Sequence, residues 1–379
     1  MMTPRERVLC SLNHEEPDRV PIFFGSSGAT TMTITAYEQL KSAFGIRRET
    51  RIMSRANQYA QIDEEVWERL PSDGRPIFPG PPPSALRRDI SADAFVDDWG
   101  ITWRKNPAAP YYEANEAPLG SASADDLSKY PWPELSHPSR FKGLAAEAQA
   151  IQQRGFAVVA LSGVSIFEQI QFLRGLDTWL IDLADNSDFA QAMLRRMTDM
   201  MKASLTALMD AAGQYIDVVI TADDMGTQNS PFISPSMYRQ MYKPLHAELV
   251  ATIRARSKAK VFFHSDGNIF PLLKDLIDVG VDLLNPVQVS AKDMGDTARL
   301  KRLFGDRLSF CGAVDTQRVL PYGTPDDVRR EVRQRIKDLA PGGGYVCAAV
   351  HSILADVPVE NVCAMFDEAI KAGKYPLSL

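Results

Sequence analysis

Short apolar runs and longer amphipathic stretches alternate along the second half of this chain. The short runs are rich in Val, Ile, Phe and Ala, as buried strands are, whereas the longer stretches repeat apolar residues every three or four positions, as helices do. Parallel strands need crossover connections, which are usually helices. The pattern therefore predicts a parallel β/α series with strands that end near Ser162, Thr221, His264, Gln288, Val314 and Val350.

Helix boundaries follow from capping residues and from the ends of the apolar periodicity. Ser234, with Pro235 directly after it, begins one long helix, and Gly280 ends another. After residue 140 we expect helices over residues 142–154, 166–173, 178–183, 189–213, 234–256, 269–279, 297–304, 326–339 and 359–372. Before residue 71 we expect a strand over residues 19–24, ending near Gly25, and helices over residues 3–12, 37–44 and 63–69.

Residues 71–140 differ from the rest because prolines interrupt regular structure repeatedly. Two stretches in this region, 99–105 and 111–117, have the pattern of a β-hairpin. A disordered linker is disfavoured because the region is rich in Trp and Tyr. We therefore predict one domain over residues 1–379, with 71–140 as an inserted segment that caps or borders its active face.

Each apolar strand run ends on a functional group. Ser162, Asp223, His264, Asp315 and His351 all follow such runs directly or within two residues. In a (β/α)₈ barrel the active site is built at the carboxyl ends of the strands. The sequence therefore predicts an α/β protein, a (β/α)₈ TIM barrel with a Pro- and aromatic-rich insertion near the barrel mouth.

Composition and charge exclude several function classes. The chain has 379 residues, 45% hydrophobic and 24% charged, which is typical of a globular protein. Its net charge is −6 and it has no basic tract, so nucleic acid is not an expected partner. The apolar stretches are too short to span a membrane, and residues 1–12 do not form a secretory signal. We expect a cytoplasmic protein with four reduced cysteines.

The most specific candidate for chemistry is a metal site. His264 and Asp266 lie two residues apart at a strand end, so both point to the same face, and Gly267 lets the chain turn afterwards. His351 ends the last strand, which returns to its neighbours in a closed barrel. Two histidines and a carboxylate could bind Zn²⁺ with one open position. The alternative is a hydrogen-bonded His264–Asp266 pair, with His351 as a substrate-binding imidazole.

Carboxylates at other strand ends are candidate catalytic groups. Asp223 and Asp224 follow an apolar strand, and one of them should enter the pocket as a metal ligand, a general acid or a hydrogen-bond acceptor. An N-cap or salt-bridge role is the alternative for this pair. Glu168 begins a helix among apolar neighbours, so it is either partly enclosed or a solvated first-turn residue.

Four further polar residues at strand ends are expected to bind or orient substrate. They are Ser26, Ser162, Gln288 and Asp315. The remaining histidines, His14, His137 and His246, fall in loop or helix contexts and are expected to be non-catalytic.

A set of motifs spread over nearly the whole chain resembles the uroporphyrinogen decarboxylase superfamily. They are TPRERV at 3–8, PDRVP at 17–21, DDWGITW at 97–103, YPWP at 130–133, DDMGTQ at 223–228, HSDG at 264–267 and GAVDTQ at 312–317. The resemblance implies a (β/α)₈ barrel and one of two chemistries. These are cofactor-free decarboxylation of uroporphyrinogen and zinc-dependent methyl transfer among small substrates, thiols and corrinoid proteins.

The sequence departs from the pattern of each chemistry. Decarboxylases of the family hold substrate carboxylates with arginines in the loop after the first strand, and residues 25–30 contain none. Methyltransferases carry His-x-Cys-Gly and a second Cys; here Asp266 replaces the first Cys and His351 stands at the second. Carboxylate and imidazole ligands in place of thiolates suit oxygen substrates better than thiols.

We therefore expect a methyltransferase- or O-demethylase-like enzyme that acts on a small-molecule substrate. Zn²⁺ held by His264, Asp266 and His351 would assist, and the acceptor would be a thiol or a corrinoid carried by a partner protein. A homodimer is a further expectation. Two alternatives stay open: a uroporphyrinogen decarboxylase-type carboxy-lyase and a non-catalytic tetrapyrrole- or corrinoid-binding protein.

Overall fold

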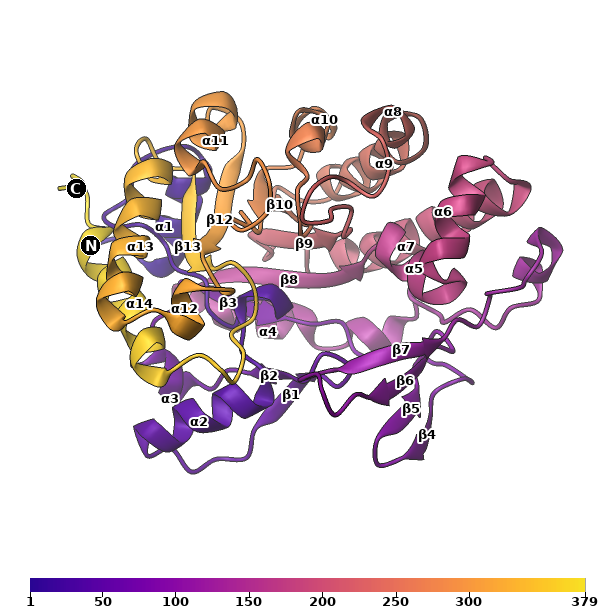
Figure 1. Ribbon diagram of the computed structural model, residues 1–379, viewed down its shortest axis with the longest axis horizontal. Coiled ribbons are helices and arrows are strands. Elements are labelled where there is room, and N and C mark those ends of the chain that lie inside the picture. Colours follow the sequence, from indigo (N-terminus) through magenta and orange to yellow (C-terminus); the bar gives the residue numbers. More distant parts are fainter. Residues whose placement is uncertain (379) are drawn as a thin grey trace.

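A curved sheet of seven parallel strands forms the centre of the computed structural model, which describes residues 1–378 and, at Val164, the backbone alone. Its helices surround the sheet on the outside (Figure 1). The strands follow the order β13-β12-β11-β10-β9-β8-β3. Their bounds are β3 (Gly74–Ile77), β8 (Ala157–Val164), β9 (Val218–Ala222), β10 (Lys260–His264), β11 (Leu283–Asn285), β12 (Ser309–Val314) and β13 (Tyr345–Ala349). The expected (β/α)₈ TIM-barrel architecture is thereby confirmed.

The chain near Ile22 closes the ring between β13 and β3. Ile22 forms a parallel bridge with Cys347 of β13, and its carbonyl accepts a hydrogen bond from the Asp73 amide just before β3. A strand was expected over residues 19–24. The segment has the position of the eighth strand, but its pairing within the described residues is limited to this bridge, an antiparallel bridge of Arg19 with Lys374 and a few hydrogen bonds.

The predicted start of the insertion at residue 71 is wrong, because β3 belongs to the barrel sheet. Pro76 within β3 made this stretch look irregular. Proline is tolerated at weakly paired sheet positions, since it lacks the N–H that a ladder needs. Here β3 has a regular ladder only with β8, where Pro76 pairs with Val159. The inserted part therefore begins after Ile77.

The amphipathic stretches form the outer helices at nearly the expected positions. The bounds are α1 (Pro4–Leu12), α2 (Ile34–Phe44), α3 (Glu64–Trp67), α4 (Leu144–Gln153), α5 (Phe167–Arg174), α6 (Leu176–Ala184), α7 (Asp188–Ala212), α10 (Leu273–Val279), α11 (Thr297–Phe304), α12 (Val319–Tyr322), α13 (Pro325–Leu339) and α14 (Val359–Ala372). The stretch expected as one helix over 234–256 is divided into α8 (Pro235–Met237), a π-helical turn η4 (Tyr238–Tyr242) and α9 (Lys243–Arg254). Among the described residues, no helix has both the length and the apolar character to cross a membrane.

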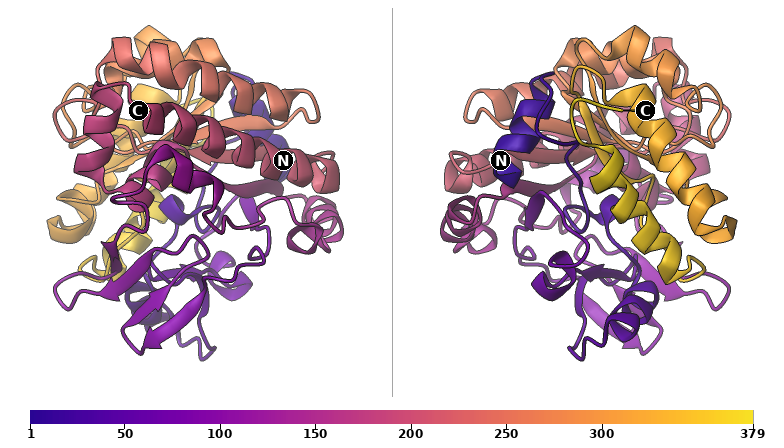
Figure 2. Two further views of the ribbon diagram at one scale, coloured as in Figure 1. Left: turned by 90° about the vertical axis from the view of Figure 1, so that its right-hand side faces the viewer. Right: turned by 90° about the vertical axis from the view of Figure 1, so that its left-hand side faces the viewer.

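The insertion folds as a small antiparallel sheet beside the barrel (Figure 2). Its strands are β4 (Arg88–Ser91), β5 (Ala94–Val96), β6 (Thr102–Lys105) and β7 (Tyr112–Glu116). The pairing of β6 with β7 confirms the hairpin predicted from the sequence. A second hairpin, β1 (Arg51–Ser54) with β2 (Tyr59–Gln61), was not expected. It places Asn57 and Tyr59 opposite the barrel mouth.

Helix α1 fills one end of the barrel, which leaves the other end for a site. Val8 and Leu12 of α1 pack into the interior cluster of the strands with Val159, Phe262 and Val346. The Ser11 hydroxyl donates to the carbonyl of Tyr345, the first residue of β13. The amino-terminal end of the barrel is therefore packed, and the carboxyl ends of the strands face the insertion.

Candidate active site

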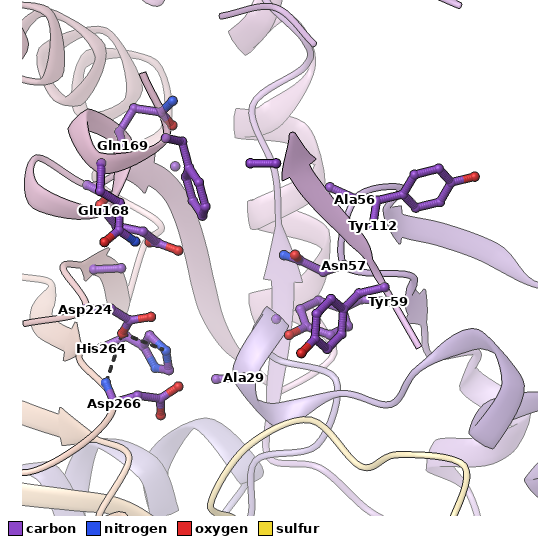
Figure 3. Close-up of a pocket in the computed structure, with 18 of the residues that line it drawn as sticks. Ala29, Ala56, Asn57, Tyr59, Tyr112, Glu168, Gln169, Asp224, His264 and Asp266 are labelled. Atoms are coloured by element: carbon purple, nitrogen blue, oxygen red, sulfur yellow. Dashed lines mark hydrogen bonds and ion pairs between the residues drawn. The ribbon is translucent and has the colours of Figure 1, made fainter. Parts of the chain in front are cut away.

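A cavity of about 980 Å³ lies between the carboxyl ends of the strands and the inserted sheet. One wall carries Glu168 and Gln169 from the start of α5, and the opposite wall carries Asn57 and Tyr59 (Figure 3). Three further residues, Asp224, His264 and Asp266, gather at the strand ends below Glu168 in this view. Strand β7 borders the same cavity, as expected for a segment near the barrel mouth.

His264, the last residue of β10, is held in a defined orientation. Its Nδ1 lies 2.7 Å from Oδ1 of Asn285, the last residue of β11. Because an amide oxygen only accepts, Nδ1 carries the proton, and the lone pair of Nε2 is directed elsewhere. Nε2 lies 3.7 Å from Oδ1 of Asp224. The neighbouring strand thus orients the imidazole towards the cavity.

His351 and Asp266 complete a cluster with His264. His351 Nε2 lies 3.7 Å from Asp266 Oδ2, and its Nδ1 lies 3.0 Å from the Ser352 hydroxyl. One ligand atom from each of His264, Asp266 and His351 lies within 4.8 Å of the others. The fit to a metal is good, because both Nδ1 atoms have hydrogen-bond partners while both Nε2 atoms face carboxylates.

Two glycines let the Asp266 loop lie against the Asp224 loop. Gly267 has φ +84°, and a side chain there would meet backbone atoms of Gly226 and Thr227 at 2.4–2.6 Å. The close approach lets the Asp266 amide donate to Asp224 Oδ1 at 2.9 Å. Gln288 fixes the same turn, since its Oε1 accepts from the Gly267 amide at 2.6 Å.

Burial and mutual charge perturb the protonation of this cluster. Burial lowers the pKa of His264, but the carboxylates of Asp224 and Asp266 outweigh it and raise that pKa above its ordinary value. Burial prevails at His351 and lowers its pKa. Burial also raises the pKa of Asp224, although His264 opposes this. Such opposed shifts within one pocket are typical of functional sites.

Glu168 is a carboxyl group that holds its proton near neutrality. Burial, followed by the charge of Asp224, raises its pKa to about 8. The sequence left open whether Glu168 is enclosed or solvated, and the structure places it in the wall of the cavity.

Asp223 lies behind the cavity and fixes the turn that carries Glu168. Its Oδ1 accepts hydrogen bonds from the Ser165 hydroxyl (2.8 Å) and from the amides of Phe167 (2.6 Å) and Glu168 (3.3 Å). Its Oδ2 lies 2.8 Å from Nε2 of His246. Of the adjacent pair, Asp224 therefore lines the cavity and Asp223 does not, because consecutive side chains point to opposite faces.

The four residues expected to bind substrate are divided by the structure. Ser162 lines the cavity, whereas Ser26, Gln288 and Asp315 do not. The Ser26 hydroxyl is buried and bonds with Ser72 and the Gly74 carbonyl, and its neighbour Ser27 lines the cavity instead. Asp315 accepts from the amides of Gln317 and Arg318 in its own turn.

Sequence reasoning missed several residues that shape the site. Asn57 and Tyr59 come from an unpredicted hairpin, and His246 was expected to be a non-catalytic residue. Asn285 ends a strand next to His264, and this position in the strand pattern was the signal that could have identified it.

The comparisons with known proteins place this barrel in a family. The polar groups gather at the carboxyl ends of the strands, where (β/α)₈ barrels have their active sites. The family model for uroporphyrinogen decarboxylase (URO-D) matches residues 155–372, more than half of the chain. The chain belongs to the uroporphyrinogen decarboxylase family, so the resemblance read from its motifs is confirmed.

Individual relatives include both chemistries of the superfamily. Uroporphyrinogen decarboxylase from Coxiella burnetii is 26% identical over 49% of this chain and 48% of the relative, so the match spans about half of that protein. Methylcobamide:CoM methyltransferase MtaA from Methanosarcina barkeri is 24% identical over 60% of this chain and 68% of the relative. A methyltransferase from Methanosarcina mazei shares the fold over 98% of this chain and 99% of its own, with TM-score 0.66 and 18% identity.

Proposed function

We propose that this protein is a metal-dependent methyltransferase or O-demethylase that removes a methyl group from a small substrate. The observation that carries the proposal is the convergence of His264, Asp266 and His351 within 4.8 Å at the strand ends. The similarity to a methylcobamide:CoM methyltransferase and to a second methyltransferase over the whole fold supports it.

His264, Asp266 and His351 would hold Zn²⁺, because two neutral imidazoles and a carboxylate form a common donor set for a catalytic zinc. When bound, the ion would supply Lewis-acid activation of a substrate oxygen or thiol. Asn285 and Ser352 orient the two imidazoles from behind, as the partners of metal-bound histidines usually do.

Glu168 is the group we assign to proton transfer. When an ether oxygen loses its methyl group, the electrons of the C–O bond stay with that oxygen, and the acceptor supplies the pair that bonds the methyl carbon. The neutral Glu168 carboxyl gives its proton to the leaving oxygen. Asp224 keeps the Asp266 turn in place through the Asp266 amide.

The acceptor would be a corrinoid bound to a partner protein, or a thiol. The cavity volume of about 980 Å³ is at the upper end of the usual range for ligand pockets, roughly 300–1,000 Å³. That volume gives room for a small substrate together with the group that accepts the methyl.

The second candidate is a decarboxylase, because the Coxiella burnetii relative carries that name. The residues that line the cavity disfavour a decarboxylase. Among the described residues, no lysine or arginine lines the cavity, and carboxylate-rich substrates are normally held by arginine.

Elemental analysis of the purified full chain, joined to two activity assays, tests the proposal. We expect about one zinc per chain, and methyl transfer from a methyl ether to a reduced corrinoid that a chelator abolishes and zinc restores. His264→Ala should lose the metal and the activity, whereas His137→Ala, a change at a half-buried histidine outside the cavity lining, should keep both. Methyl transfer by the metal-free chain, or decarboxylation of uroporphyrinogen without metal, would overturn the proposal.

A further inference from the structure

The charge distribution around the cavity points to a substrate class. Five acidic residues line it: Glu113, Glu116, Glu168, Asp224 and Asp266. No lysine or arginine of the described chain shares that lining. Away from the proposed metal position, an anionic ligand would therefore meet carboxylates, with no lysine or arginine of the described lining to offset its own desolvation.

The arginines closest in sequence to the cavity lining are already paired elsewhere. Arg55 forms an ion pair with Asp89 and lies over the Phe95 ring. Arg174 is buried, pairs with Asp182 at 2.8 Å and lies 3.8 Å above the Phe189 ring. Releasing Arg174 to a ligand would leave Asp182 without this partner, so neither Arg55 nor Arg174 is free to bind a carboxylate.

Arg104 is exposed beside the mouth and is engaged with the same strand that supplies the acids. Its Nε donates to Asn115 Oδ1 at 3.2 Å, and its guanidinium lies 3.8 Å from Glu116. Within the described part of the chain Glu113 has no ion-pair partner, and its Oε1 accepts a hydrogen bond from the side-chain amide of Asn106 at 2.8 Å. The rim formed by β7 therefore stays acidic.

An aromatic wall joins the insertion to the barrel at this rim. The Trp103 ring of β6 lies 5.3 Å from the Phe172 ring of α5, centroid to centroid, and both line the cavity. Tyr59 lines the opposite side, with its ring 6.3 Å from His351. Flat rings gain stabilisation from such surfaces beyond the area that they bury.

We propose that the cavity binds an aromatic methyl ether that carries no anionic group, with its ring against Trp103 and Phe172. The methyl group of this ligand is inferred from the proposed methyl transfer, so this part of the inference rests on the proposed function. The preference for a ligand without negative charge and the contact with its ring are inferred from the residues that line the cavity. Glu113 and Glu116 reject the carboxylated analogue by repulsion at the rim.

The test compares two probes of one shape, 4-methoxybenzyl alcohol and 4-methoxybenzoate. Each is titrated calorimetrically into the full chain, zinc-loaded and chelator-treated. We expect the alcohol to bind at least tenfold more tightly than the carboxylate in both forms. Equal affinities, tighter binding of the carboxylate, or no binding of the alcohol would overturn the inference.

Matched variants locate the contacts. Trp103→Leu should weaken binding of the alcohol about tenfold, whereas Trp99→Leu, which removes an inserted tryptophan outside the cavity lining, should leave it unchanged. The double variant Glu113→Gln/Glu116→Gln should raise the affinity for 4-methoxybenzoate at least threefold. Equal effects of the two tryptophan changes, or an unchanged carboxylate affinity in the double variant, would contradict the proposed binding mode.

The outcome is separable from that of the proposed function because binding is measured without turnover. Selective binding of the alcohol with no methyl transfer to a corrinoid or thiol would remove the proposed function and keep the substrate class. Methyl transfer that proceeds as well from 4-methoxybenzoate as from the alcohol would keep the proposed function and remove the substrate class.

Discussion

His246 Nε2 lies 2.8 Å from Asp223 Oδ2, and both side chains are buried. Nδ1 of the same imidazole lies 3.0 Å from the Tyr238 hydroxyl in the π-helical turn η4. Through Asp223 Oδ1 the pair reaches the amides of Phe167 and Glu168. A histidine on α9 thus fixes the first turn of α5, which places Glu168 in the cavity wall.

Loss of the His246 imidazole should destabilise the fold. His246→Leu leaves the buried Asp223 carboxylate without one partner, so we expect the free energy of unfolding to fall by about 3–5 kcal/mol. Denaturation with urea measures this change. His246→Gln, whose amide N–H can replace Nε2–H, should recover part of the loss. His137→Leu, at a half-buried position whose ring caps the short helix Pro138–Phe141, should cost only about 1 kcal/mol. A His246→Leu variant as stable as the parent would show that this hydrogen bond contributes nothing.

Asn285 should control metal affinity without touching the metal. Its Oδ1 accepts from His264 Nδ1, so Asn285→Leu should leave the imidazole free to rotate and weaken zinc binding about 10–100-fold. Competition with a chromogenic chelator measures the affinity. The matched control is Asn57→Leu, which removes an amide from the opposite wall and should leave zinc affinity unchanged. Equal affinity in both variants would mean that His264 is not a ligand oriented in this way.

The pH dependence of turnover should report Glu168. Burial and Asp224 raise its pKa to about 8, so the acid that gives the proton is present below this pH and is lost as pH rises through it. We expect kcat to fall above pH 8 in steady-state assays. Glu168→Gln should lower kcat by about 10²–10⁴-fold and abolish that alkaline limb. Glu147→Gln is the control: burial also raises the pKa of that carboxyl, but it lies on α4 outside the cavity lining.

The same shift sets the sign of a stability effect in metal-free protein. The folded-state pKa of Glu168 is above the ordinary 4.5, so the folded state binds the proton more tightly than the unfolded state does. The stability that this provides is complete below about pH 4.5 and is lost as pH rises towards 8. Glu168→Gln should therefore reduce the fall in melting temperature over this range. An identical fall in the variant would show that other groups cause it.

Gly267→Ala should disrupt the Asp266 turn. An added Cβ would meet backbone atoms of Gly226 and Thr227 at 2.4–2.6 Å, and φ of +84° disfavours any other residue. Gly45→Ala is a matched control, because φ there is +69° and nothing lies within 4 Å of the added Cβ. Gly45→Ala should cost about 1–2 kcal/mol for the left-handed backbone alone. Gly267→Ala should cost clearly more in urea denaturation and should also lower zinc content; equal costs would mean that the close approach is not required.

Local patterns in the sequence determined the barrel and most of its helices. The apolar runs gave β8 to β13 and the periodic stretches gave α7, α13 and α14, because burial on both sheet faces and on one helix face demands those patterns. Two stretches misled. Pro76 made β3 look like irregular structure. The apolar periodicity over 234–256 continues through the π-helical turn η4, because the burial of one helix face does not show whether the backbone hydrogen bonds span four or five residues.

The position of polar residues at strand ends was also enough to select His264, Asp266 and His351 from the sequence alone. Strand parity sends His264 and Asp266 to one side, and closure of the barrel brings the last strand back to its neighbours. The sequence could not tell which of Asp223 and Asp224 faces the cavity, since that depends on how the loop leaves β9. It also predicted that Ser26, Gln288 and Asp315 bind or orient substrate, whereas their side chains complete hydrogen bonds of nearby turns and loops.

Only the tertiary structure decided what surrounds the predicted cluster. His246 reaches Asp223 across 23 positions, and Asn57 faces Glu168 from a hairpin more than a hundred residues away. Such contacts depend on the packing of whole elements, and no local pattern encodes them. The chain alone thus determined which strands form the barrel and which ligand types meet at its mouth. Packing decided that Asp224 enters the cavity and that His246 stays behind it. Packing also raises the pKa of Glu168, because this side chain is buried only once the walls of the cavity have assembled.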